Sequence, residues 1–258
     1  MVARVFPVSD WAFFFFRGED AKAFLQGLVT ADLAALSAGG WTPACVLTPK
    51  GLLAADCELY DRGSGVLALT RPAAAEGFAR AFSTKIMLSR STMERPRPRA
   101  HLLFDAETAA GLPWRDLGGP VRLLLDAEPP RDAAPMSREE FHARRAAAGL
   151  PWFGVDMDGS TLPLEARQEA AVSLTKGCFM GQETVSRQAR RGRVTRRLAR
   201  VRFAGAAPAP GAAVSAAGAE AGRITSSAGE WALAMLRAEA AVAGTAVESG
   251  SVRGAVVD

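Results

Sequence analysis

The sequence has few residues of the kinds that build metal centres. Its 258 residues include three cysteines, Cys45, Cys57 and Cys178, and two histidines, His101 and His142, all widely spaced. A structural zinc site takes about four ligands, and an iron–sulfur cluster usually takes four thiolates. The chain therefore cannot complete either centre alone from cysteine and histidine, and its odd cysteine count argues against a disulfide framework.

Long apolar runs are also absent. No run reaches the roughly 18–20 residues that span a bilayer. The segment "WAFFFF" at 11–16 is too short for that and predicts a buried strand. The opening "MVARVFPVSD" has no signal-peptide core or cleavage site. We therefore expect a cytoplasmic protein.

The charge and the length of the chain exclude fewer classes of protein than these absences do. Charged residues make up 22% of the chain, the net charge is +4 and 49% of residues are hydrophobic. A mildly basic chain permits an anionic ligand or partner without requiring nucleic acid. The length allows one large domain or two to three small ones.

The order of predicted elements is that of an α+β protein. Apolar spacing predicts a helix over 18–33, and Pro72 marks the start of another over 71–86. Ser137 and Glu140 form the pattern of a capping box for a helix that ends at Gly149. Strands are predicted at 12–16, 41–47, 52–60, 66–70, 101–104 and 121–125.

The C-terminal part predicts a small β-barrel. Ala199, Val201 and Phe203 alternate with arginines, and the segment 206–222 is rich in Ala, Gly and Pro. The apolar segment "WALAMLR" follows at 231–237. Alternation with glycine-rich turns is typical of such barrels.

The stretch "TKGCFMGQETVSRQARRGRVTRR" at 175–197 carries the strongest chemical signal. A thiol reacts as its thiolate, which a cation or a helix N-terminus stabilises. Lys176 could supply the cation, Gly177 leaves room for close backbone approach, and a helix after Gly181 would place Cys178 ahead of its positive end. Alternatively, Cys178 is a small buried hydrophobe and both glycines only serve a turn.

Three carboxylates have more than one interpretation each. Glu165, in "LPLEA", suits the N–H donors of a pterin or purine, or it is a helix-start glutamate. Glu183 is a second candidate ligand or stabilises its own helix start. Asp56 lies mid-strand in "GLLAADCELY", so it must be paired, protonated or part of a site.

Eight arginines fall within 16 residues. Such a density binds phosphates or a polyglutamate tail, or it forms a solvated face. No aromatic residue lies between the first and the last of them to stack bases, which weakens a single-strand nucleic-acid interpretation. The run consists of Arg187, Arg190, Arg191, Arg193, Arg196, Arg197, Arg200 and Arg202.

The octapeptide "KGCFMGQE" at 176–183 resembles the K-G-C-[FY]-x-G-Q-E signature of the YgfZ-type folate-binding proteins. These are relatives of the glycine-cleavage T-protein, an aminomethyltransferase, and of the mitochondrial factor that helps mature [4Fe–4S] proteins. The resemblance covers most of the chain. It includes "GEDAKAFLQGLVTADL", "LTPKGLLAADCELY", "RRAAAGLPWFGVDM" with "LPLEA", "RGRVTRRL", and "GRITSS" with "LAMLR".

The resemblance implies a T-protein-like fold. This is an α+β, three-lobed (cloverleaf) arrangement with a small C-terminal β-barrel and a central folate-binding channel. We expect lobes at 1–97, 98–195 and 196–258, with a chain that can cross between the first two.

The resemblance also implies a function. We expect a protein that binds tetrahydrofolate or a derivative and supports assembly, insertion or repair of [4Fe–4S] clusters in client enzymes, tRNA-modifying ones included, without independent turnover. Its partners would be folate and iron–sulfur client or assembly proteins, with no membrane, no direct nucleic-acid binding and a monomeric state.

The family's functional residues transfer by position. Cys178 and Lys176 become the functional pair. The thiolate of Cys178 could bind iron transiently, trap a one-carbon or sulfur species, or join a mixed disulfide, and the sequence does not choose among these. Asp56 falls where the T-protein has two acids, one of them catalytic, and Ala55 takes the other place. The implied folate contacts are Glu165, Gln182, Glu183, Arg187 and Arg145.

Two other functions stay open. One is a folate-dependent aminomethyl or one-carbon transferase with Asp56 as its acid or base. The other is a basic nucleic-acid-binding module built on the arginine run, whose affinity would fall steeply with salt.

Overall fold

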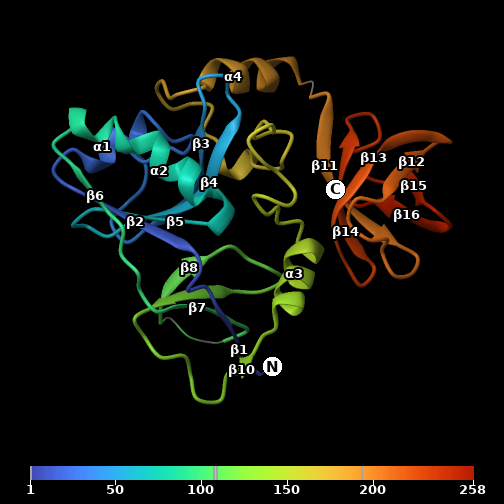
Figure 1. Cartoon of the computed structure of the whole chain (residues 1–258), viewed down its shortest axis with the longest axis horizontal. Coiled ribbons are helices and arrows are strands. Elements are labelled where there is room, and N and C mark those ends of the chain that lie inside the picture. Colours follow the sequence, from blue (N-terminus) through green and yellow to red (C-terminus); the bar gives the residue numbers. More distant parts are fainter. Residues whose placement is uncertain (1, 107, 109, 193) are drawn as a thin grey trace. The chain divides into compact units, whose positions relative to one another are not determined.

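The computed structural model describes the whole chain except residues 1, 107, 109 and 193. The chain forms two compact units (Figure 1). The first comprises Met1–Ser9, Pro98–Pro151 and Thr195–Asp258, and the second comprises Asp10–Arg97 and Trp152–Val194. The chain therefore passes from one unit to the other after Ser9, Arg97, Pro151 and Val194.

The first unit contains a five-stranded sheet, a helix and a barrel. The sheet has the order β10-β1-β7-β9-β8, in which β1 runs parallel to β10 and the other pairs are antiparallel. Helix α3 starts with the predicted capping box, in which Ser137 Oγ accepts from the Glu140 N–H. The bounds are β1 Arg4–Pro7, β7 Ala100–Phe104, β8 Leu112–Trp114, β9 Val121–Leu125, β10 Ala134–Pro135 and α3 Arg138–Ala147.

The barrel is closed, with strand order β11-β14-β13-β12-β15-β16 (orange to red in Figure 1). Ala199, Val201 and Phe203 are buried inside it, whereas Arg202 faces solvent, so the predicted C-terminal barrel is confirmed. The bounds are β11 Arg196–Phe203, β12 Ala213–Ala216, β13 Ala219–Ala228, β14 Trp231–Arg237, β15 Ala246–Ser249 and β16 Val252–Val256.

The second unit is built on an antiparallel sheet of order β3-β4-β5-β2-β6. Its strands are β2 Ala12–Arg17, β3 Trp41–Leu47, β4 Leu53–Asp61, β5 Val66–Thr70 and β6 Thr92–Glu94. Its α-helices are α1 Ala21–Gln26, α2 Ala75–Ser83 and α4 Gln182–Arg191, and its 3₁₀ turns are η1 Pro72–Ala74, η2 Ile86–Leu88 and η3 Glu169–Ala171.

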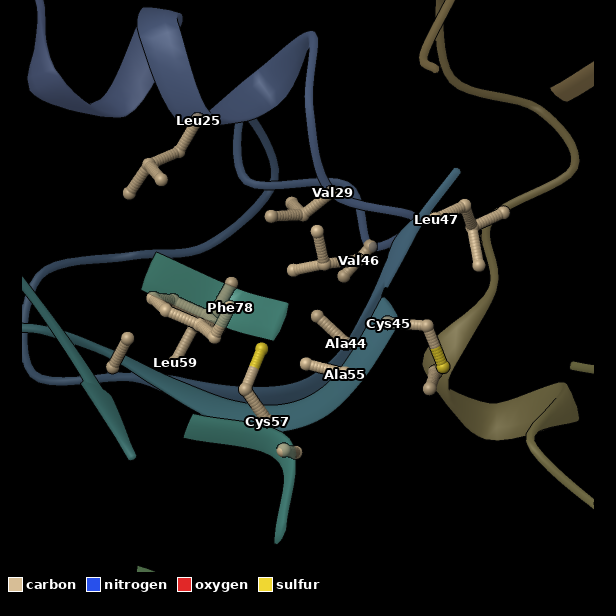
Figure 2. Packing of buried hydrophobic residues seen from close by; sticks show 14 of the residues in the cluster. Leu25, Val29, Ala44, Cys45, Val46, Leu47, Ala55, Cys57, Leu59 and Phe78 are labelled. Carbon is tan, nitrogen blue, oxygen red and sulfur yellow. The ribbon is translucent and has the colours of Figure 1, made fainter. Parts of the chain in front are cut away.

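The two faces of this sheet differ in chemistry. Figure 2 shows Ala55, Cys57 and Leu59 of β4 on the side that carries Phe78 of α2, where they form part of the apolar core. Cys45 lies on the opposite side. Side chains alternate along a strand, so Asp56, which pairs directly with Cys45 in the register, faces away from α2.

One predicted helix is wrong in its length. The expected helix over 18–33 is only α1, Ala21–Gln26. The chain then turns, and Val29 forms an isolated β-bridge with Val46 of β3. The apolar residues after α1 are thus buried by tertiary contact with the sheet rather than by continuing the helix.

Candidate functional site

Cys178 lies in the loop that leads into α4. It is exposed, whereas Cys45 and Cys57 are buried. The alternative of a small buried hydrophobe is therefore wrong for Cys178. The neighbouring Phe179 is only 6% exposed and belongs to the core of the second unit.

Lys176 points its ammonium group into a set of backbone carbonyls. Its Nζ donates to the carbonyls of Gln26, Val29 and Ala31 at 2.6, 2.9 and 2.6 Å. The side chain is 8% exposed. Burial lowers the pKa of Lys176 to about 8, against the nearby charge of Asp32, which acts in the opposite direction.

Gly181 is the glycine that close packing requires. It caps α4 in the left-handed region at φ +79°, and an added Cβ would meet the Thr48 carbonyl oxygen at 2.6 Å. A Cβ at Gly51 of the β3–β4 turn would meet Thr184 of α4 at 2.7 Å. A Cβ at Gly177 would meet nothing within 4 Å, so the close approach predicted there is wrong and occurs at Gly181.

The remaining signature residues start α4. Gln182 is its first residue and is half-buried, while Glu183 lies in its first turn. Glu183 forms an exposed ion pair with Arg187, one turn later, at 2.5 Å. These side chains remain accessible to a charged ligand.

Part of the arginine run has partners. Arg200 pairs with Asp258 at 3.0 Å and Arg202 with Glu230 at 3.0 Å. Arg193 lies outside the described residues. The free positive charge of this run is therefore smaller than the sequence suggests.

Glu165 is buried, with 5% of its surface exposed. Its carboxylate Oε2 accepts from the Leu162 N–H at 3.2 Å. Residues 163–167 form turns rather than a helix, so the helix-start interpretation of Glu165 is wrong. Gln168 of the same segment is 1% exposed, and no described residue provides a hydrogen bond to its Oε1.

Asp56 belongs to a buried ion cluster. Its Oδ2 lies 3.7 Å from Nη2 of Arg71, which follows directly after β5. Arg71 also forms a bidentate pair with Glu58, with Nη2 at 2.9 Å from Oε1 and Nη1 bonded to Oε2. Burial opposes the charge of Arg71, but Glu58 and Asp56 outweigh it and hold the pKa of the guanidinium above its usual value.

Two tryptophans complete this cluster. The Arg71 guanidinium lies 4.9 Å from the ring centre of Trp11 and 5.3 Å from that of Trp152. The rings meet edge to face at 5.5 Å. Sequence reasoning missed Glu58 and Arg71, although Asp56 and Glu58, two residues apart on a strand, had to share a face.

Arg145 lies in the first unit, in α3. It is 2% exposed. Its three guanidinium nitrogens donate to His142 Nδ1 at 2.7 Å, to the Leu150 carbonyl at 3.2 Å and to Ser226 Oγ at 2.7 Å. These contacts give Arg145 a structural role inside its own unit.

The described residues contain neither a candidate metal centre nor a helix fit to span a membrane. No group of three or more His, Cys, Asp or Glu side chains in the described part of the chain is arranged to hold a metal ion. Among the same residues, no helix is long and apolar enough to cross a bilayer.

The fold of this chain matches that of a protein of known structure. The structure superposes on the crystal structure of glycine cleavage system aminomethyltransferase T from Bartonella henselae with a TM-score of 0.87. The match covers 99% of this chain and 85% of that one at 15% sequence identity. The expected α+β, T-protein-like fold is therefore confirmed.

Similarity in sequence relates the chain to one family model and to particular proteins. Residues 195–257 match the family described as CAF17, C-terminal beta-barrel domain. The chain is 26% identical over 226 residues to the tRNA-modifying protein YgfZ of Yersinia pestis (strain Pestoides F), covering 74% of this chain and 68% of that protein. It is 27% identical over 266 residues to the mitochondrial iron–sulfur cluster assembly factor IBA57 of Mus musculus, covering 86% and 74%. The resemblance to YgfZ-type proteins is thereby confirmed.

Proposed function

We propose that this chain is a tetrahydrofolate-binding accessory protein that supports assembly, insertion or repair of [4Fe–4S] clusters in client enzymes, including tRNA-modifying ones. The observation that carries the proposal is the exposed thiol of Cys178 within the octapeptide. The names of its relatives, a tRNA-modifying protein and an iron–sulfur cluster assembly factor, support the same direction.

The chemistry of one thiolate fits an accessory role. A single accessible thiolate can bind iron transiently or join a mixed disulfide, but it leaves the other positions of a cluster to a partner. The buried Cys45 and Cys57 cannot contribute in the folded state. The cluster is thus cargo that this protein contacts through one sulfur atom.

The second unit offers acceptors that suit a pterin. The N–H groups of a pterin need hydrogen-bond acceptors, and both the Glu165 carboxylate and Gln168 Oε1 are buried acceptors in one short segment. When bound, the folate would supply a carrier for one-carbon groups. We propose Glu165 as its main anchor, with Gln182, Glu183 and Arg187 of the same unit as further contacts.

A rescue assay tests the role of the thiol. We expect Cys178→Ala to fold and to bind tetrahydrofolate, yet to lose the rescue of [4Fe–4S] enzyme activity in a deletion strain. Thr175→Ala, in the same exposed loop, is the matched control and should rescue fully. Full rescue by Cys178→Ala would remove the thiol from the mechanism.

The fold favours one competing function. A chain that superposes on an aminomethyltransferase could itself transfer one-carbon groups. Such a transferase needs an acid or base, and Asp56 is 1% exposed and held beside Arg71. Its burial leaves Asp56 little access to a substrate, so we place this function second.

A further inference from the structure

The loop that presents Cys178 is bound on both sides to one other loop. This loop comprises residues 26–31, from the last residue of α1 onward toward β3, and it takes part in each hydrogen bond described below. Before Cys178, the Ser173 N–H donates to the Thr30 carbonyl at 2.9 Å. After it, the Met180 N–H donates to the Gly27 carbonyl at 3.2 Å.

Lys176 adds three bonds to the same loop. An ammonium group carries three hydrogens, and the Lys176 ammonium directs them to the carbonyls of Gln26, Val29 and Ala31. With all three used, Lys176 has no N–H left to donate to a thiolate at Cys178. The hydrogen bonds of Lys176 therefore hold the backbone of residues 26–31 rather than the thiol of Cys178.

Thr30, in the 26–31 loop, also holds the two loops together, through its hydroxyl group. Its side chain is fully buried. Its Oγ1 donates to the Ala171 carbonyl at 2.5 Å and accepts from the Cys45 N–H of β3 at 2.8 Å. This hydroxyl joins the sheet, the 26–31 loop and the segment before Cys178 without carrying a charge.

We propose that Lys176 is a positioning residue that, together with Thr30, clamps the Cys178 loop onto residues 26–31. The clamp fixes the chain on both sides of the thiol, and the buried Phe179 anchors it next to Cys178. Only Gly177 and Cys178 are exposed between the pinned points at Lys176 and Phe179. The thiol is thus held in one place on the surface, which deepens the proposed function without depending on folate.

A spin label on Cys178 tests the clamp. Cys178 is exposed while the other two cysteines are buried, so a nitroxide reagent labels it selectively in the folded protein. We expect Lys176→Met and Thr30→Val each to increase label mobility and to speed amide exchange at Met180 by at least about fivefold, the effect of losing one hydrogen bond. Thr30→Ser keeps the hydroxyl and should restore both values.

Two controls separate position from charge. Lys85→Met removes a lysine of the second unit that bonds one carbonyl, Ala81, and should change neither reading. The pH midpoint of Cys178 alkylation should be the same in wild type and Thr30→Val. If Lys176→Met fails to fold, Thr30→Val alone decides.

One result overturns the clamp. Wild-type label mobility in Thr30→Val, and in Lys176→Met where it folds, means that the clamp does not hold the thiol. A raised alkylation midpoint in Lys176→Met would then show that Lys176 acts on the thiol by charge. Neither measurement needs folate or a cluster. The clamp can therefore be confirmed or contradicted independently of the proposed function.

Discussion

Asp56, Glu58 and Arg71 show how a residue acquires its role from partners that lie far along the chain. The sequence places Asp56 in an apolar strand and predicts that it is paired, protonated or part of a site. The structure provides the pair, because Arg71 follows β5 and β5 lies beside β4. The pairing partner depends on strand register, which local sequence does not specify.

The cluster predicts a large loss of stability on Arg71→Met. Removing the cation leaves two carboxylates buried without their partner, which costs about 3–5 kcal/mol. Arg17→Met breaks the exposed pair of Arg17 with Glu94 in the same unit and should cost less than about 1 kcal/mol. Urea unfolding measures both, and equal costs would contradict the structural role of Arg71.

At the scale of elements, the six strands predicted before the barrel all occur, whereas the short strands β1, β6, β8 and β10 were not predicted and one predicted helix is too long. Strands β3, β5 and β9 begin and end at the predicted residues. Helix α1 stops at Gln26 although apolar residues continue at helical spacing. The Gln26 carbonyl, which would accept the next helical bond, instead accepts from Lys176, about 150 residues away, and the Gly27 carbonyl accepts from Met180, so tertiary contacts replace helical bonds beyond this point.

The start of α4 gives a prediction at this scale. Gly181→Ala combines a left-handed backbone with a clash against the Thr48 carbonyl oxygen. Gly63→Ala, at φ +73° with no atom within 4 Å of its added Cβ, should cost only about 1–2 kcal/mol for the backbone.

Gly181→Ala should cost about 1–3 kcal/mol more than that, because backbone atoms cannot yield easily. It should also weaken the bond from Thr184 Oγ1 to the Lys50 carbonyl, now 3.0 Å. Thermal unfolding of the two variants measures the difference. Equal melting temperatures would show that the turn and α4 tolerate the methyl group.

At the scale of the molecule, the order of elements is readable from the sequence but their grouping is not. The predicted boundaries at 97 and 195 fall beside two of the four places where the chain changes unit. The segments 10–97 and 152–194 form one unit because their apolar residues share one core. Local periodicity contains no information on which distant segments share a core, and the resemblance implied only that the chain can cross between the first two lobes.

The candidate folate site is tested on the whole protein. Trp11 and Trp152 lie in the second unit, with Glu165 and Gln168, so intrinsic tryptophan fluorescence is a suitable signal for titration with tetrahydrofolate. We expect saturable binding by the wild type. Glu165→Ala removes a charged acceptor and should weaken the affinity by about tenfold or more.

The matched variants decide what Glu165 does. Glu169→Ala removes an exposed acid four residues further on, and its affinity should equal that of the wild type. Gln168→Leu removes a neutral acceptor and should lose about fivefold, less than Glu165→Ala, because hydrogen bonds to charged groups are stronger. Wild-type affinity in Glu165→Ala would show that the pterin does not bind at this segment.

A transfer assay on the same protein tests the competing function. Transfer from an aminomethyl donor to tetrahydrofolate would favour the transferase, and loss of that transfer in Asp56→Asn would place the reaction at the buried ion cluster.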